Sequence, residues 1–77
     1  MQGRLRLLYL LKDSGFYVRM HAYEYVIGDG KRFIAIVLLE PSRRSATVIR
    51  LGENVEQVIN VLRKVDPELS VKVASRS

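Results

Sequence analysis

The alternation of side chains along residues 16–27, followed at once by a glycine-rich turn, is the feature that most constrains the fold of this chain. Residues 16–27 read FYVRMHAYEYVI, with apolar side chains at the even positions except Glu24 and aromatic or basic ones at most odd positions. That two-residue period is typical of a β-strand. Asp29-Gly30 is a strong hairpin signal, and residues 32–39 (RFIAIVLL) are apolar at odd and even positions alike, as in a central strand. These segments predict an antiparallel hairpin.

A two-residue turn at Asp29-Gly30 fixes how the two strands pair, and the pairing assigns each side chain to a face. On one face, which we call the aromatic face, tyrosine, histidine and arginine side chains surround an aliphatic floor. It is predicted to contain Tyr17, Arg19, His21, Tyr23, Tyr25, Ile34, Ile36 and Leu38, with Tyr25 opposite Ile34, Tyr23 opposite Ile36 and His21 opposite Leu38. The other face is predicted to lie in the core with Val18, Met20, Ala22, Val26, Phe33, Val37 and Leu39.

Helical spacing of leucines and valines predicts two helices. The first covers residues 4–12 and ends at Ser14-Gly15, where Gly15 suits a left-handed backbone. The second begins with a capping box formed by Asn54 and Gln57 and ends before Pro67. The apolar stripes are Leu5, Leu8 and Leu11, widened by Leu7 and Leu10, in the first helix and Val55, Val58, Ile59, Leu62 and Val65 in the second.

Residues 46–51 are predicted to form a third strand. Placing Ile49 and Leu51 in the core puts Val48 and Arg50 on the aromatic face, because side chains alternate along a strand.

Residues 69–73 also alternate and predict a short fourth strand, after which residues 74–77 are expected to fray. The predicted fold class is α+β, with an antiparallel three- to four-stranded sheet and two helices on one of its faces. The predicted order is α-β-β-β-α-(β), in one domain that spans residues 1–77.

The length and composition bound what can stabilise such a domain. A chain of 77 residues buries only about 60% of its unfolded surface, so its core is small. It has no cysteine, which excludes disulfides and thiolate metal sites, and 48% of its residues are hydrophobic. We therefore expect self-association, as a homodimer, to supply the remaining stability. The excess of arginine over lysine is typical of some thermophile families.

The first apolar run, LLYLL at residues 7–11, has charges on both sides. It is too short to span a membrane and lacks the small-residue cleavage site of a signal peptide. We expect a cytoplasmic protein with no membrane partner.

The net charge of +5 is unevenly distributed. Residues 1–50 contain nine basic and four acidic side chains, whereas residues 51–77 contain four of each. Such a localised excess is the footprint expected of a polyanion binder. Lys31 and Arg32 are predicted at one end of the aromatic face, and Arg43 and Arg44, in the turn before the third strand, at the other.

The aromatic face predicts single-stranded DNA or RNA as the partner. Unpaired bases stack on aromatic side chains while nearby arginines meet the phosphates. In this hypothesis the tyrosines stack, Arg19 and Arg50 meet phosphates, and the turn residues steer the strand. Tyrosine and arginine are also enriched at protein interfaces, so a dimer interface on the same face is an equal alternative. The predicted nucleic-acid-binding residues are Tyr17, Arg19, His21, Tyr23, Tyr25, Lys31, Arg32, Ile34, Ile36, Arg43, Arg44 and Arg50.

The sequence offers no set of catalytic or metal-binding groups. His21 is the only histidine, and a general acid or base needs a partner group. In the predicted strand Glu24 lies on the opposite face from His21, so the two do not form a metal site. We therefore expect a non-enzymatic protein without a cofactor.

Two families of RNA-directed proteins share features with the chain. The order helix, three strands, helix resembles the double-stranded-RNA-binding domain, although the second helix opens with the acidic Glu53-Asn54-Val55-Glu56, which would repel phosphates. Residues 7–37 resemble HicA-type toxins, with LLYLLKDSGFYVR followed by HAY and GDGKR. That resemblance implies an RNA-cleaving enzyme in which His21 is catalytic, the alternative to a non-enzymatic binder.

A third resemblance is to the archaeal ThermoDBP-type single-stranded DNA-binding proteins. These use a four-stranded antiparallel sheet, backed by helices, to hold bases in an apolar cleft. The chain is similar to that plan through Tyr17, Tyr23, Tyr25, Ile34, Ile36 and Arg19. The resemblance implies binding of single strands on the aromatic face.

Overall fold

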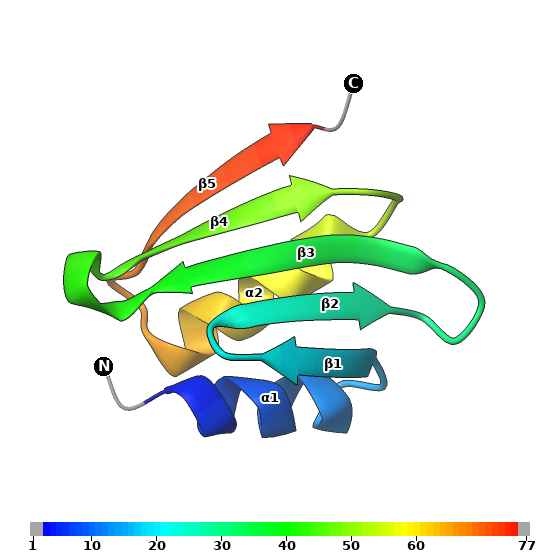
Figure 1. The fold of residues 1–77 in the computed structure, drawn as a ribbon, viewed down its shortest axis with the longest axis horizontal. Helices are drawn as coiled ribbons and strands as arrows, with labels where there is room; N and C mark the ends of the chain where they lie inside the picture. The colour runs from blue at the N-terminus through cyan, green and yellow to red at the C-terminus, as the bar shows by residue number, and fades with distance from the viewer. Residues whose placement is uncertain (1–2, 76–77) are drawn as a thin grey trace.

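The computed structural model of the chain describes residues 3–75, in which a five-stranded sheet is backed by two helices (Figure 1). The strands lie side by side in chain order. Neighbours are antiparallel except β4 and β5, which are parallel. The elements are α1 (Arg4–Asp13), β1 (Tyr17–His21), β2 (Glu24–Gly28), β3 (Phe33–Glu40), the 3₁₀ turn η1 (Pro41–Arg43), β4 (Ser45–Arg50), α2 (Val55–Val65) and β5 (Ser70–Ser75).

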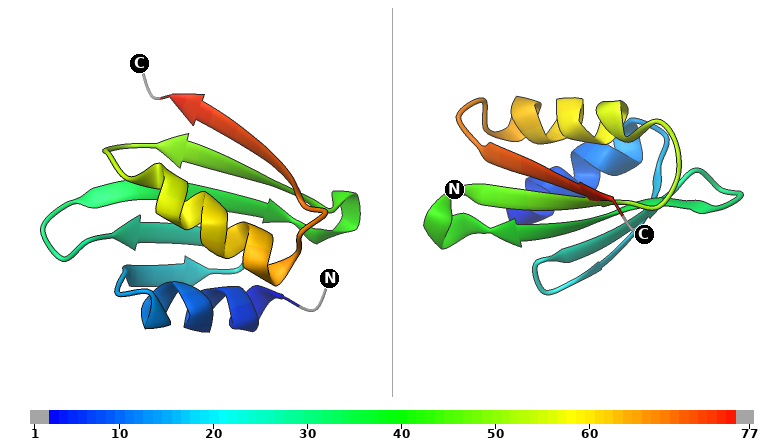
Figure 2. Two further views of the ribbon diagram at one scale, coloured as in Figure 1. Left: turned by 180° about the vertical axis from the view of Figure 1, so that it is seen from behind. Right: turned by 90° about the horizontal axis from the view of Figure 1, so that it is seen from above.

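Both helices lie on the same side of the sheet, as Figure 2 shows from behind and from above. A parallel pair of neighbouring strands needs a crossover connection, and α2 is the crossover from β4 to β5. The α+β class and the mostly antiparallel sheet are therefore as predicted. The predicted strand count is wrong, because the described order is α-β-β-β-β-α-β. β5 extends past the predicted end of the last strand to Ser75, and the rest of the tail predicted to fray, residues 76–77, lies outside the described part.

Residues 16–27 form two strands rather than one. Ala22 and Tyr23 make a two-residue hairpin loop between β1 and β2, and His21 pairs with Glu24 across it. Ala22 has a φ of 54°, a left-handed value at the first loop position, where a type II′ turn usually has glycine. Because neither loop residue is Gly, Pro, Asn or Asp, the sequence gives no signal for this turn.

The loop between β2 and β3 is longer than the predicted two residues, so the predicted pairing of these strands is wrong. Tyr25 pairs with Val37 and Val26 with Ile36. The loop comprises residues 29–32, and the main-chain N–H of Asp29 donates to the carbonyl of Arg32 at 3.1 Å. The new register places the odd residues of β2 in the core and its even residues on the other face.

A β-bulge interrupts the same pair of strands. Ile27 pairs with Ala35 but Gly28 pairs with Phe33, so Ile34 is an extra residue in β3. Ile34 and Ala35 are both buried, whereas half of the Phe33 side chain is exposed. The bulge therefore turns Ile34 into the core and turns Phe33 away from it, against both predictions.

The faces of β4 are opposite to the prediction. Val48 is fully buried beneath the helices and pairs with Val37, whereas Ile49 is only half-buried. Arg50 shares the helix-covered side of β4 with Val48, and its guanidinium lies 3.9 Å from the Glu56 carboxylate of α2. The pairing of β4 with β3 sets these faces, and the sequence of β4 alone does not reveal it.

The helices pack their apolar stripes against the sheet and against each other. In α1 the fully buried residues are Leu7 and Leu11, four residues apart, while Leu5 is half exposed. Leu8 and Leu10 pack against the core at its margin, so the predicted stripe of α1 is confirmed except at Leu5. Gly15 ends α1 with a φ of 96°, as predicted. The predicted stripe of α2 is confirmed, with Val55, Val58 and Leu62 buried and Ile59 and Val65 packed at its margin.

The predicted capping box of α2 is absent from the described structure. Asn54 has a left-handed φ of 68° and its side chain makes no capping hydrogen bond. The carbonyl of Asn54 instead accepts from the N–H of Gln57 at 3.3 Å. Asparagine adopts a left-handed backbone more readily than most residues. Asn54 therefore contributes to the start of α2 through its backbone conformation and not through a side-chain cap.

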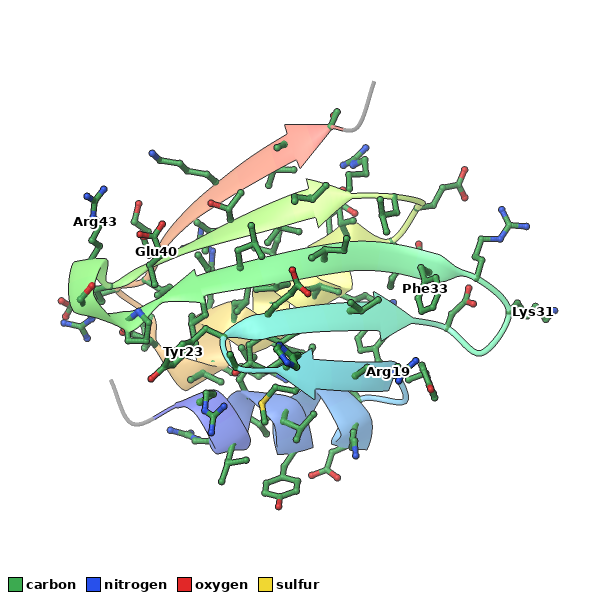
Figure 3. The ribbon with its side chains drawn as sticks, viewed as in Figure 1. Arg19, Tyr23, Lys31, Phe33, Glu40 and Arg43 are labelled. Carbon is green, nitrogen blue, oxygen red and sulfur yellow. The ribbon has the colours of Figure 1, made fainter. Side chains whose placement is uncertain are left out.

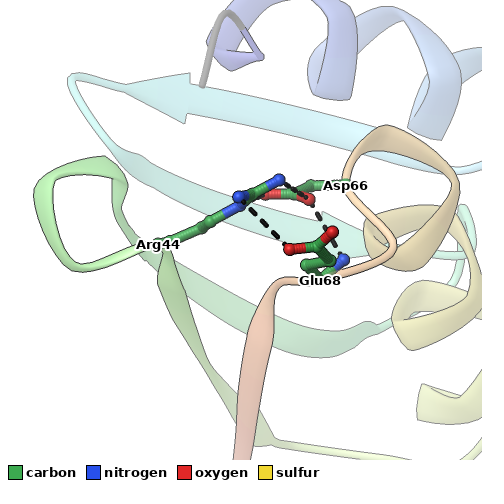
Figure 4. A network of polar contacts seen from close by, with 3 residues as sticks. All are labelled: Arg44, Asp66 and Glu68. Carbon is green, nitrogen blue, oxygen red and sulfur yellow. Dashed lines mark hydrogen bonds and ion pairs between the residues drawn. The ribbon is translucent and has the colours of Figure 1, made fainter.

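An ion-pair cluster joins the η1 turn to the segment between α2 and β5 (Figure 4). Arg44 donates to both carboxylate oxygens of Asp66, from Nε at 2.6 Å and from Nη2 at 2.8 Å. Asp66 is buried, and its Oδ1 also accepts the N–H of Glu68 at 3.1 Å. Such a bidentate pair fixes orientation as well as distance. It holds the start of β5 beside the start of β4, where the Ser70 N–H donates to the Arg44 carbonyl at 3.0 Å.

Neither α1 nor α2 is long and apolar enough to cross a lipid bilayer, and residues 3–75 contain no other α-helix.

Candidate functional site

The sheet face opposite the helices, which we call the open face, has no helix over it within residues 3–75 (Figure 2). Its composition follows from the strand register and the burial of each residue. Polar and charged side chains lie mainly on the outer strands, and apolar side chains lie near the centre. The open face consists of Tyr17, Arg19, His21, Glu24, Val26, Phe33, Ile36, Leu38, Thr47, Ile49, Lys72 and Ala74.

Two aromatic side chains and a glycine occupy neighbouring strands at one end of the open face. Tyr17 of β1 pairs with Gly28 of β2, which pairs with Phe33 of β3. Tyr17 is 53% exposed and Phe33 is 50% exposed, although large aromatic side chains are usually covered. Gly28 has no side chain to separate them, and the three residues line one hollow of about 230 Å³.

The loop between β2 and β3 adds positive charge to the same end. Lys31 and Arg32 are exposed and line the hollow together with Tyr17 and Phe33. The Oδ1 atom of Asp29 accepts the main-chain N–H groups of Lys31 at 2.9 Å and of Arg32 at 3.0 Å. These two hydrogen bonds hold the pKa of the Asp29 carboxyl below its usual range. The carboxylate therefore shapes the loop and faces its backbone.

A second hollow, of about 300 Å³, continues along the open face from the first. Phe33 lines both hollows, and the second is also lined by Arg19, His21, Glu24 and Val26. His21 and Glu24 are opposite each other across the β1–β2 turn. Contrary to the prediction, the two therefore share a face, because the turn at Ala22 and Tyr23 changes the alternation between them.

An aliphatic strip forms the centre of the open face. Ile36 of β3 is flanked by Val26 of β2 and Ile49 of β4, and all three are half-buried. Leu38 continues the strip and is 37% exposed. The predicted aliphatic floor is thus present through Ile36 and Leu38, but not through Ile34, which the bulge places in the core.

Tyr25 does not belong to the open face. It lies fully buried under α1, and its hydroxyl donates to the Arg4 carbonyl at 2.7 Å. Burial raises the pKa of Tyr25 to about 12. The prediction that Tyr25 stacks on a base is wrong, because the unrecognised turn moved it to the helix side of the sheet.

Tyr23 lies in the β1–β2 turn, at the opposite end of the sheet from Phe33 (Figure 3). The guanidinium carbon of Arg4 is 5.5 Å from the centroid of its ring, within cation–π range. Arg4 also donates from Nη1 to the Ala22 carbonyl at 2.9 Å. Tyr23 is thus engaged by α1 at the rim of the sheet, not on the open face as predicted.

The predicted basic residues of the second half of the sheet have other partners. Arg44 is held by Asp66 in the cluster of Figure 4, and hydrogen bonding to Asp66 raises the pKa of its guanidinium. Arg50 lies on the helix side, beside Glu56. Arg43 is highly exposed and lies 3.8 Å from Glu40, far from Lys31 at the other end of the sheet (Figure 3). Of these three, Arg43 has the most exposed side chain.

The open-face residues that were not among the predicted site residues include Phe33, Val26, Ile49 and Lys72. Phe33 and Val26 were missed because the wrong register and the unrecognised bulge assigned both to the core. Ile49 was missed because the two faces of β4 were predicted the wrong way round. Lys72 pairs with Thr47, and only the parallel placement of β5, which the sequence does not encode locally, brings it to this face.

Residues 3–75 contain no cluster of three or more His, Asp or Glu side chains that could hold a metal ion. Comparisons with protein-family models, with curated proteins and with solved structures find no match to this chain.

Proposed function

We propose that the open face binds single-stranded nucleic acid, DNA or RNA, without catalysing a reaction. The observation that carries this proposal is the pair of half-exposed rings, Tyr17 and Phe33, on either side of Gly28. Exposed aromatic rings offer stacking surfaces to unpaired bases, and each stacked base contributes about 1–3 kcal/mol. The chain would then bind strands as the ThermoDBP-type proteins that its sequence resembles do. Phe33 would take the stacking role predicted for the buried Tyr25. We place this activity in the cytoplasm.

Charge supports the same choice of partner. Arg19, Lys31 and Arg32 line the two hollows beside the rings, and Lys72 lies on the far strand of the face. A nucleic acid strand needs such cations at phosphate distance from its stacked bases. Asp29 does not oppose them strongly, because its carboxylate is directed to the loop backbone.

The test is fluorescence anisotropy of labelled single-stranded DNA, single-stranded RNA and duplex across a salt series. We expect single strands to bind more tightly than duplex, with log K falling against log salt by about 0.7 per phosphate contacted. Tyr17→Ala should weaken binding by about 1–3 kcal/mol. Tyr9, which is 59% exposed on α1, provides the matched control, and Tyr9→Ala should bind as the unmodified chain does. Absence of binding at low salt would refute the proposal.

A subunit interface is the second candidate function of the open face. The specific observation is the aliphatic strip of Val26, Ile36, Leu38 and Ile49, which is incompletely buried in one chain. In this case the chain is a homodimer, and Leu38→Asp should convert it to a monomer in sedimentation analysis. Dimers that persist in this variant would rule out the open face as the subunit interface.

RNA cleavage is the third candidate, favoured by one observation. His21 and Glu24 lie opposite each other and line one hollow with Arg19, so an acid, a base and a phosphate-binding cation share a site. RNA turnover that His21→Ala abolishes would support cleavage, and intact RNA after prolonged incubation with the unmodified chain would exclude it.

A further inference from the structure

We propose that the hollow between Tyr17 and Phe33 is a subsite for a single nucleobase, with the phosphate of that nucleotide directed to Lys31 and Arg32. This subsite rests on the proposed function of the open face. It adds to that function a defined position in the strand, at which one base leaves its neighbours and enters the hollow.

The spacing of the strands sets the width of the subsite. Tyr17, Gly28 and Phe33 are in register on three neighbouring strands, so two strand spacings, about 9.6 Å, separate the backbones that carry the rings. A flat ring stacked between two others needs about 7–8 Å between their planes. The backbone separation therefore leaves room for one planar ring between the side chains of Tyr17 and Phe33.

Gly28 keeps the space between the rings open. A Cβ atom at this position would lie 3.5 Å from Cδ1 of Phe33 and 2.9 Å from the carbonyl oxygen of Arg32. Any side chain at position 28 would therefore project into the hollow and collide with the loop backbone. The backbone of Gly28 is the floor on which a base edge would rest.

The loop that carries the two cations has a fixed conformation. Asp29 accepts the N–H groups of Lys31 and Arg32 through one oxygen, and its own N–H donates to the Arg32 carbonyl. The main chain that carries the two cations is thus held beside the hollow before a ligand arrives, which lowers the entropy cost of binding. A ring that carries a phosphate matches this arrangement of aromatic walls and positive rim.

The hollow favours a base within a strand over a free nucleotide. It is a surface hollow lined by six residues, whereas sites for small ligands bury most of the ligand surface. The second hollow begins at the same Phe33 ring and leads past Arg19 toward Val26. A strand can therefore continue from the subsite along the open face and interact with side chains that a single nucleotide does not reach.

The absence of tryptophan from the chain allows a direct test with a tryptophan reporter. Phe33→Trp places a fluorophore in the subsite, and Tyr9→Trp places one on the outer surface of α1 as the control. Both are titrated with oligodeoxythymidine, with the same backbone lacking bases, and with thymidine monophosphate, while anisotropy of a labelled strand reports binding independently. Tyr17→Trp is the second reporter if Phe33→Trp does not fold.

We expect oligodeoxythymidine to quench the emission of Phe33→Trp and to leave that of Tyr9→Trp unchanged. The strand without bases should cause no quenching. Adding Tyr17→Ala to the Phe33→Trp variant should weaken the affinity about tenfold, the equivalent of one stacked base.

Binding seen by anisotropy without quenching of Phe33→Trp would overturn the subsite while leaving the proposed function intact. Equal quenching by thymidine monophosphate at the same concentration would replace the strand subsite with a free-nucleotide site. Absence of binding in anisotropy would overturn the subsite and the proposed function together.

Discussion

The hydroxyl of Tyr25 donates a hydrogen bond to the main-chain carbonyl of Arg4, 2.7 Å away and 21 residues earlier in the chain. The side chain of Arg4 in turn donates to the Ala22 carbonyl and lies over the ring of Tyr23. The first turn of α1 is thereby joined to the β1–β2 turn and to β2. A tyrosine that the sequence suggested for ligand binding instead joins a helix to the sheet.

Tyr25→Phe should destabilise the fold by about 1 kcal/mol, because the Arg4 carbonyl loses its partner while the ring remains in place. Urea unfolding followed by circular dichroism measures this change. The matched control is Tyr9→Phe, which removes an exposed hydroxyl and should leave the midpoint unchanged. Equal midpoints for the Tyr25→Phe variant and the unmodified chain would mean that this hydrogen bond contributes no net stability.

Alkaline pH should destabilise the fold through Tyr25. Burial raises its pKa to about 12 in the folded state, above the usual value near 10, so the fold favours the neutral phenol. The stability that the neutral phenol contributes to the fold is fully present below about pH 10 and is lost as the pH rises from about 10 through about 12. The unfolding midpoint should fall over that range, and less steeply in Tyr25→Phe. Parallel pH profiles for the two proteins would contradict this account.

Ala22→Gly should stabilise the protein by up to about 1 kcal/mol. The left-handed φ of 54° strains an alanine, whereas glycine adopts it without a steric penalty. Part of the gain is offset because glycine makes the unfolded chain more flexible. Thermal unfolding should show a melting temperature several degrees higher, with Ala74→Gly on β5 as a control that does not raise it. A lower melting temperature for Ala22→Gly would show that the strain relieved at position 22 is smaller than the cost of a more flexible unfolded chain.

The Arg44–Asp66 pair should make the stability of the fold depend on pH in the acid range. The Arg44 guanidinium holds the pKa of the Asp66 carboxyl below its usual range. The pair therefore stabilises the fold fully at pH values above the pKa of an aspartate in the unfolded chain, near 3.9. That stability is lost as the pH falls through the lower, folded pKa. Asp66→Asn should therefore lower the melting temperature at pH 7 and flatten its decline in acid. Glu68→Gln removes an exposed carboxylate 3.5 Å from Arg44 and should change little.

The salt dependence of strand binding should identify the cations that meet phosphates. Replacing both Lys31 and Arg32 by glutamine should reduce the slope of log K against log salt by about 1.4, or about 0.7 for each phosphate that is no longer neutralised. Arg63→Gln, on the outer surface of α2, is the control and should keep the slope. A slope that falls equally in the control would indicate general charge attraction in place of a site.

The parts of the fold that could be predicted are those with strong local periodicity. The stripe of α2 repeats at helical spacing and was correct, as was the stop of α1 at Gly15. The alternation of β3 correctly placed Ile36 and Leu38 together. What failed was long-range register: the turn at Ala22 has no turn residue, and the bulge at Ile34 has no sequence signal. The turn reverses the chain and the bulge adds one residue, and each places the neighbouring side chains on the face opposite to the predicted one.

The same reason explains which site residues were predicted. Tyr17, Arg19 and His21 precede the unrecognised turn, so their shared face was correct, and Lys31 and Arg32 lie in a loop that the glycines indicate. Tyr25 and Ile34 follow the turn or the bulge, and both were wrongly assigned to the open face. Arg50 was assigned to the wrong face because the sequence of β4 does not reveal its pairing with β3. Arg44 lies in the turn where it was predicted, and its ion pair with Asp66 could not be predicted because the two residues are 22 positions apart in the chain.

The bulge in β3 also bears on how such a protein can evolve. Ile34 and Phe33 are adjacent in the chain, yet one fills the core and the other faces the open surface. Selection can therefore change the residue at position 33, and with it the chemistry of the open face, while the packing around position 34 is preserved. Loss of the extra residue would end this independence, because a substitution at that end of the strand would then alter the open face and the core together.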